Sequence, residues 1–148
     1  MSFNVAQFKT LIERVLSELD PDLASPVAVK LLLGTAAQES RFGTFLYQLG
    51  GGLAKGAFQM EPATFEWLQD RYQEKYPAIF GRKASDMEWD LRLSIIMCRL
   101  RYRIVKDDLP ADDLMSLASY WKLWYNTPKG AGTPEQFVEN YRKYVHEV

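Results

Sequence analysis

Histidine and cysteine are almost missing from this sequence: His146 and Cys98 are the single examples of each. A Ser-His-Asp or Cys-His catalytic site needs a firmly held imidazole, and His146, third from the end, is poorly placed to supply one. A structural zinc site needs about four cysteine or histidine ligands, and one cysteine cannot form an intramolecular disulfide. We therefore expect no metal and no cofactor. Any chemistry must rest on carboxylates, hydroxyls, amides, lysine or arginine.

The sequence also lacks an excess of charge and a long apolar run. Its 18 Lys and Arg against 19 Asp and Glu give a net charge of -1, which does not favour nucleic acid or an anionic membrane as partner. The most apolar run, residues 31–37, is far shorter than the roughly 20 residues that span a bilayer. The first 20 residues do not resemble a secretory signal. We expect no membrane insertion, no signal peptide and synthesis in the cytoplasm.

The apolar residues recur at helical spacing along most of the 148 residues, which predicts an all-α, compact single domain over residues 1–148. Residues 43–58 break this pattern with five glycines, and we expect a Gly-rich loop or a short hairpin there, with a strand at 45–49 as the open alternative. The predicted helices cover about 4–19, 26–40, 62–76, 89–106 after a capping box Ser85-x-x-Glu88, 110–125, and a last segment after Thr133-Pro134-x-Gln136.

Glu39 is the first candidate for catalysis. It lies in the last turn of the nearly uncharged helix 26–40 and shares a face with apolar residues such as Leu32 and Ala36. The negative end of the helix dipole and partial burial both disfavour a carboxylate there, so the carboxyl should stay protonated near neutral pH, as a general acid must. The alternative is a solvated glutamate, or one paired with Arg41.

The glycines after Glu39 support a cleft beside it. Gly50, Gly51, Gly52 and Gly56 can adopt positive φ and let backbone approach a ligand closely. The phosphate-binding pattern GxxxxGK[ST] is absent. The alternative is a surface loop with no ligand.

Three motifs in this order resemble the soluble lytic transglycosylases, a family with a lysozyme-like α-helical fold shared with goose-type lysozymes. Residues 39–42, Glu-Ser-Arg-Phe, resemble the family's E-S-x-F signature, and residues 56–64, GAFQMEPAT, resemble its G-x-x-Q-x-x-P-A-T. Tyr125-Asn126 resembles the late Tyr-Asn pair, although Thr127-Pro128 replaces the usual Ala-Gly. The resemblance extends over about residues 26–145.

The resemblance implies cleavage of the β-1,4 bond between N-acetylmuramic acid and N-acetylglucosamine in peptidoglycan, with formation of a 1,6-anhydro ring. One glutamate, here Glu39, would act first as acid and then as base. Ser40, Gln59 and Tyr125 would bind the substrate or orient Glu39. Glu61, the nearest second carboxylate, is expected to cap the helix that Pro62 begins, so a two-carboxylate site is less favoured.

Two alternatives stay open at this point. The same fold can hydrolyse the bond with water, as goose-type lysozymes do, or the chain can be a non-catalytic glycan-binding module. Trp121 and Trp124 are either sugar-stacking platforms or core residues, with the core favoured by their spacing. The expected partners are peptidoglycan glycan strands. The absence of a signal suggests a bacteriophage origin, with virion or lysis proteins as further partners.

Overall fold

The computed structural model describes residues 2–48 and 50–146, which form a mostly helical domain. Part of the expected strand at 45–49 lies outside these residues, at position 49. The α-helices are α1 (Val5–Leu19), α2 (Pro26–Ser40), α3 (Pro62–Tyr72), α4 (Leu91–Arg103), α5 (Leu114–Trp121) and α6 (Pro134–Asn140). Short 3₁₀ turns are η1 (Pro21–Leu23), η2 (Pro77–Ile79) and η3 (Ala84–Glu88), and π-helical turns are η4 (Lys122–Asn126) and η5 (Tyr141–Val145).

Two helix starts that the sequence predicts are confirmed in atomic detail. The Ser25 hydroxyl accepts a hydrogen bond from the amide of Ala28 at 3.2 Å, with Pro26 as the first residue of α2. Thr133 and Gln136 form the expected reciprocal capping box at the start of α6. Each cap satisfies a backbone N–H that has no partner within its helix, which fixes where the helix begins.

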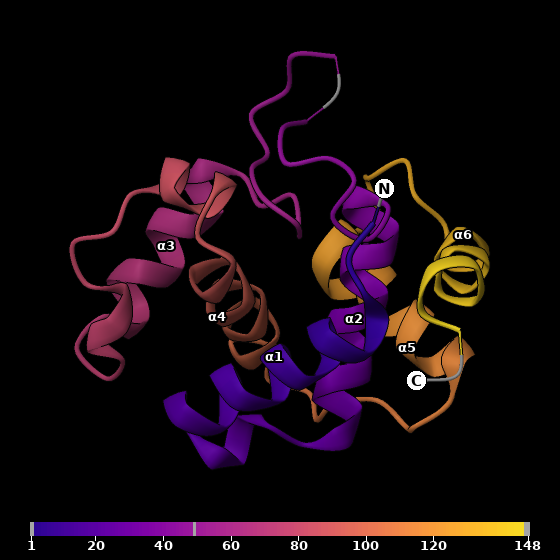
Figure 1. Cartoon of the computed structure of the whole chain (residues 1–148), viewed down its shortest axis with the longest axis horizontal. Helices are drawn as coiled ribbons and strands as arrows, with labels where there is room; N and C mark the ends of the chain where they lie inside the picture. The colour runs from indigo at the N-terminus through magenta and orange to yellow at the C-terminus, as the bar shows by residue number, and fades with distance from the viewer. Residues whose placement is uncertain (1, 49, 147–148) are drawn as a thin grey trace.

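Helix α2 is the central element, as its apolar sequence predicts. In Figure 1 it stands in the middle of the molecule, with α3 and α4 on one side and α5 and α6 on the other. It contacts α1, α4, α5 and α6. A helix surrounded on all sides has little room for charge, which explains why Lys30 and Glu39 are its only charged residues.

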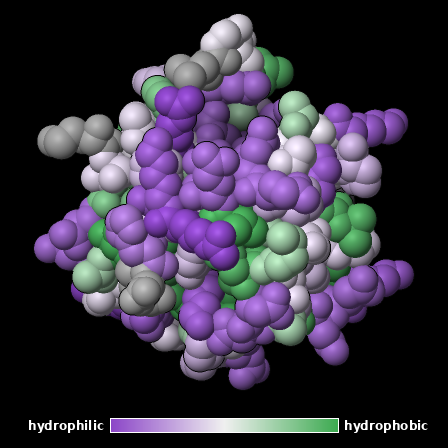
Figure 2. Space-filling view, turned by 90° about the vertical axis from the view of Figure 1, so that its right-hand side faces the viewer, coloured by the Kyte–Doolittle hydropathy of each residue, from purple (hydrophilic) through white to green (hydrophobic). Residues whose placement is uncertain are grey.

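The buried apolar side chains form one core that draws on all six α-helices. The face of the molecule in Figure 2 is mainly hydrophilic, with small hydrophobic areas between the polar side chains. Within residues 2–48 and 50–146, every helix is too short or too polar to cross a bilayer.

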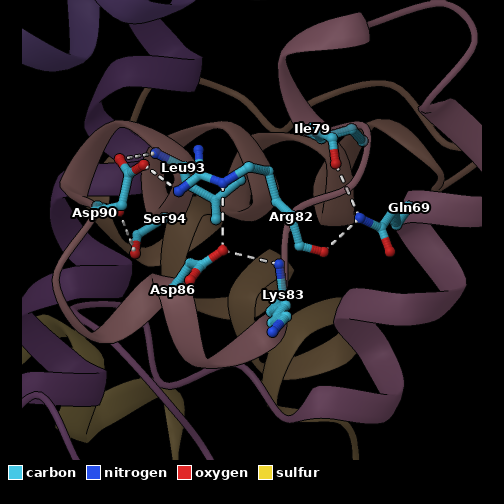
Figure 3. A network of polar contacts seen from close by, with 8 residues as sticks. All are labelled: Gln69, Ile79, Arg82, Lys83, Asp86, Asp90, Leu93 and Ser94. Carbon is cyan, nitrogen blue, oxygen red and sulfur yellow. Dashed lines mark hydrogen bonds and ion pairs between the residues drawn. The ribbon is translucent and has the colours of Figure 1, made fainter.

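The predicted role of the Ser85-x-x-Glu88 capping box is wrong. Residues 84–88 form η3, and α4 begins only after Asp90, whose carboxylate accepts from the amide of Leu93 at 3.0 Å. The cause is a polar network around Arg82, which bonds Asp90 at 2.6 Å and Asp86 at 3.3 Å (Figure 3). Because Asp86 also accepts from the amide of Lys83 at 2.9 Å, it caps the short turn instead of the long helix.

The same network fastens the segment between α3 and α4 to both helices. Gln69 of α3 donates to the carbonyls of Ile79 and Arg82 at 2.9 and 2.7 Å (Figure 3). Ser94 of α4 donates to the carbonyl of Met87 at 2.9 Å. The segment therefore has a fixed position beside the Gly-rich loop, which approaches it closely at Met87.

The connection between α2 and α3 is a loop that rises from the end of α2 and stands away from the helices in Figure 1. Among its described residues, β-pairing is limited to isolated antiparallel bridges of Lys55 with Tyr47 and with Met60. The prediction of a Gly-rich loop is confirmed, and the described part of 45–49 forms no strand beyond one bridge.

Candidate active site

A cleft of about 730 Å³ lies where the Gly-rich loop meets the end of α2 and the π turn η4. Three of the four residues predicted for the site, Glu39, Gln59 and Tyr125, line this cleft together. They come from three separate parts of the chain, so only the folded structure brings them into one site. Three charged side chains also line the cleft: Arg41 at the end of α2, Glu61 at the start of α3 and Arg101 of α4.

Glu39 is placed by the way α2 ends. Arg41 and Phe42 adopt left-handed backbone with φ of 49° and 58°, which turns the chain sharply out of the helix. The Phe42 ring is fully buried against Phe3 and Phe8. Because burial of this ring fixes the exit of the chain, the last turn of α2 and its Glu39 are held against the cleft.

Ser40 belongs to this helix end and not to the cleft lining. Its side chain is fully buried, its hydroxyl donates to the carbonyl of Ala36 at 3.1 Å, and it accepts from the amide of Gly43 at 2.8 Å. Both sides of the hydroxyl are thus used by backbone groups. A contact with substrate would require these bonds to break. The hydroxyl holds the end of α2 together, and its predicted role in orienting Glu39 stays a prediction.

Glu39 has the electrostatic environment of a general acid. Desolvation by burial raises its pKa from 4.5 to about 7, and a hydrogen bond from the Trp121 indole acts in the opposite direction. The indole Nε1–H donates to Oε2 of Glu39 at 3.0 Å. Near neutral pH, both the protonated and the ionised form of this carboxyl are therefore populated.

Trp121 is the residue of the site whose role the sequence did not reveal. Its ring is fully buried and packs against Phe137 at 5.5 Å between ring centroids. It is therefore no sugar-stacking platform. It belongs to the core, with its one polar atom directed at the carboxyl of Glu39.

Gln59 lies at the end of a tight turn in the Gly-rich loop. The backbones of Lys55 and Met60 exchange hydrogen bonds of 2.9 and 3.0 Å, and Gln59 between them has a positive φ of 48°. Its side-chain amide donates to the carbonyl of Gly56 at 2.9 Å. This bond uses one N–H and leaves the amide oxygen as an acceptor at the wall of the cleft.

Gly56 makes this turn possible. Its φ is +80°, and a Cβ on it would lie 2.6 Å from the carbonyl oxygen of Met87 and 3.0 Å from the hydroxyl of Ser94. The position therefore requires glycine both for its backbone conformation and for the close approach to η3. The positive φ expected for the loop glycines is confirmed at Gly50, Gly51 and Gly56, and the close approach at Gly56 is to protein and not to a ligand.

Tyr125 holds the other side of the same turn. Its hydroxyl donates to the carbonyl of Phe58 at 2.7 Å, and its ring stacks on Tyr102 at 5.4 Å. Burial raises the pKa of its phenol well above the ordinary value. Through this bond Tyr125 supports the loop that carries Gln59, and the charge of Glu39 also acts on its phenol. Its predicted contact with Glu39 or a sugar stays a prediction.

Glu61 does not cap α3, contrary to the expectation from the sequence. It occupies the N-cap position of that helix, but its side chain makes no capping hydrogen bond. The side chain is exposed and lines the cleft. The cleft therefore holds a second carboxylate besides Glu39.

Two arginines also line the cleft and were not predicted for the site. The guanidinium of Arg41 lies 5.3 Å from the ring centre of Phe45, and that of Arg101 lies 5.8 Å from that of Trp67. No signal in the sequence separates these arginines from ordinary surface residues. Among the described residues, no three His, Cys, Asp or Glu side chains are grouped as a metal site requires.

No protein-family model, curated protein or solved structure matches the chain.

Proposed function

We propose that this chain is a peptidoglycan lytic transglycosylase with a lysozyme-like fold and Glu39 as its acid and base. The observation that carries the proposal is the placement of Glu39: at the wall of a cleft, with a pKa raised to about 7 and a buried indole donor on its carboxyl. A group that must first donate and then accept a proton works best when its pKa is near the ambient pH.

In the first step, the protonated Glu39 donates its proton to the glycosidic oxygen, and the bond to the anomeric carbon breaks. The carboxylate that remains is stabilised by the N–H of Trp121. In the second step, this carboxylate takes the proton of the C6 hydroxyl of the muramic residue, whose oxygen closes the anhydro ring. Glu39 is protonated again at the end, so no other acid or base is needed.

Gln59 and the loop supply the substrate contacts in this proposal. The amide oxygen of Gln59 can accept from a sugar hydroxyl or an acetamido N–H. The turn that carries Gln59 is fixed from one side by Gly56 against η3 and from the other by Tyr125. A firmly held amide orients the sugar without losing entropy on binding.

Hydrolysis is the second candidate, because the cleft contains Glu61. An exposed carboxylate at the same cleft as the acid is what an enzyme that activates water requires. The two reactions differ in product mass, since an anhydro-muropeptide is one water lighter than the hydrolytic product.

Digestion of purified sacculi followed by mass spectrometry tests both candidates. We expect anhydro products from the wild type and none from Glu39→Gln, because loss of a general acid costs about 10²–10⁴-fold in rate. Glu61→Gln is the matched control and should retain the activity if the anhydro reaction is correct. Hydrated products that disappear in Glu61→Gln would establish hydrolysis, and no release by the wild type would indicate a glycan-binding module.

A further inference from the structure

Two arginine side chains at the cleft have no acidic partner within the described chain. Arg41 directly follows α2 and is exposed, and Arg101 of α4 is partly exposed. Both line the cleft. Among residues 2–48 and 50–146, neither side chain takes part in an ion pair or a hydrogen bond. Their N–H groups are therefore not used by the protein itself.

Each of these two guanidinium groups lies over an aromatic ring. Cζ of Arg41 is 5.3 Å from the ring centre of Phe45, which also lines the cleft, and Cζ of Arg101 is 5.8 Å from that of Trp67. A ring attracts the flat face of a guanidinium, whereas the N–H groups lie in the guanidinium plane and stay free to donate. The rings thus position both charges at the cleft without occupying their donors.

The carboxyl groups of the cleft do not neutralise these arginines. Glu39 accepts from the Trp121 indole at 3.0 Å, and its pKa is raised by burial, whereas an adjacent guanidinium would lower it. Glu61 is exposed and has no ion pair among the described residues. Because Glu39 is only partly ionised near neutral pH, the four charged groups of the cleft together leave an excess of positive charge. A ligand that brings its own negative group is therefore favoured over a neutral one.

We propose that Arg41 and Arg101 bind carboxylates that the glycan carries on the lactyl group of its muramic residues. This inference rests on the proposed function, because the lactyl group is what distinguishes muramic acid from N-acetylglucosamine. The carboxylate is that of the lactyl group itself or, where a stem peptide is attached, one of the peptide. A guanidinium can hold either kind through two parallel N–H···O bonds. The two arginines would then make the cleft prefer peptidoglycan over an uncharged glycan such as chitin.

Binding of three tetrasaccharides tests this assignment without relying on turnover. The first alternates N-acetylglucosamine and N-acetylmuramic acid and carries stem peptides, and the second is the same glycan after an amidase has removed the peptides. The third is chitotetraose, which has no carboxylate. Each is titrated calorimetrically into the full chain with Glu39→Gln, so that the ligand stays intact. We expect a carboxylate-bearing ligand to bind at least about tenfold more tightly than chitotetraose.

Substitutions in the same background identify the two anchors. Arg41→Gln and Arg101→Gln should each weaken the binding of a carboxylate-bearing ligand about tenfold and leave the Kd of chitotetraose within about twofold. Arg41→Lys keeps the charge without the planar fork and should recover only part of the affinity. Arg92→Gln is the matched control, because Arg92 of the same helix α4 is 52% exposed and outside the cleft lining, and it should alter no Kd.

The pattern among the ligands identifies the source of the carboxylate. A loss confined to the ligand with stem peptides would assign the anchors to the peptide, and a loss confined to the amidase-treated ligand would assign them to the lactyl group. Because the Arg41 side chain is exposed and makes no bond, Arg41→Gln should fold normally, which circular dichroism checks.

Two results would overturn the inference. One is equal or absent binding of all three tetrasaccharides. The other is an equal loss of affinity for chitotetraose and for the carboxylate-bearing ligands in the arginine variants. Digestion of sacculi by the wild type, measured in parallel, keeps the proposed function separate. Anhydro products together with unaltered binding in Arg41→Gln and Arg101→Gln would refute the anchors alone, whereas selective losses of binding without any product would refute the lytic activity alone.

Discussion

The raised pKa of Glu39 makes the stability of the protein depend on pH in a way that Glu39→Gln should remove. Burial raises the pKa from 4.5 in the unfolded chain to about 7 in the folded protein. Between these values the folded state binds more protons than the unfolded state, so the free energy of unfolding falls as pH rises. The contribution is fully present below pH 4.5 and is lost as pH rises through 7.

The size of the loss follows from the two pKa values. A difference of about 2.5 pKa units at about 1.4 kcal/mol each amounts to about 3 kcal/mol above pH 7. This is an upper limit, because Glu39 lines an open cleft and retains some contact with water. Glutamine has nearly the same shape and cannot ionise, so Glu39→Gln should be more stable than the wild type above pH 7, by up to about 3 kcal/mol.

Denaturant unfolding followed by circular dichroism from pH 4.5 to 8.5 measures this difference. The curves of the wild type and Glu39→Gln should converge near pH 4.5 and separate as pH rises. Glu61→Gln removes an exposed carboxyl of the same cleft and should follow the wild type within about 0.5 kcal/mol. A constant offset between wild type and Glu39→Gln across this pH range would refute the reasoning, whatever the enzymatic activity of either protein.

Three further substitutions test the contacts around the site. Trp121→Phe removes the indole donor, so the pKa of Glu39 should rise above 7, and an unchanged titration midpoint in carboxyl-carbon NMR would contradict this. Tyr125→Phe should lower the free energy of unfolding by about 1–3 kcal/mol, since a buried carbonyl loses its donor; an unaltered Tm would show that this bond contributes nothing. Gly56→Ala should lower the free energy of unfolding in urea by more than about 1 kcal/mol. Gly50→Ala should lower it less, because both glycines have positive φ but only Gly56 lacks space for a methyl group.

The sequence predicts a helix start well where the capping residues lie within the next few positions along the chain. Ser25 and Thr133 cap the turn that directly follows them, and the structure shows both caps. Ser85-x-x-Glu88 has the same local pattern, but Arg82 draws Asp86 and Asp90 into a network that selects Asp90 as the cap. This competition depends on how the segment folds back, and no local pattern contains that information.

The same distinction applies to the candidate site. The position of Glu39 in the last turn of an apolar helix is a local property, and this property by itself predicts a protonated carboxyl. The indole of Trp121 is 82 positions away along the chain, and only the packing of α5 beside α2 brings it to Glu39. The bond of Tyr125 to the Phe58 carbonyl, 67 positions away, was equally hidden.

The π-helical turn η4, residues 122–126, determines how the residues after α5 are oriented around the helix axis. A π turn contains one more residue than the α turn it replaces. If the same residues formed a regular α-helix, Tyr125 would lie farther around the axis, because each residue of an α-helix turns the chain by about 100° and each residue of the wider π turn turns it by less. Trp121 would keep its bond to Glu39, but Tyr125 would turn away from the Phe58 carbonyl. The π turn therefore couples the loop at Phe58 to the helix that carries Trp121, and a change that restores regular α-helix there would uncouple them.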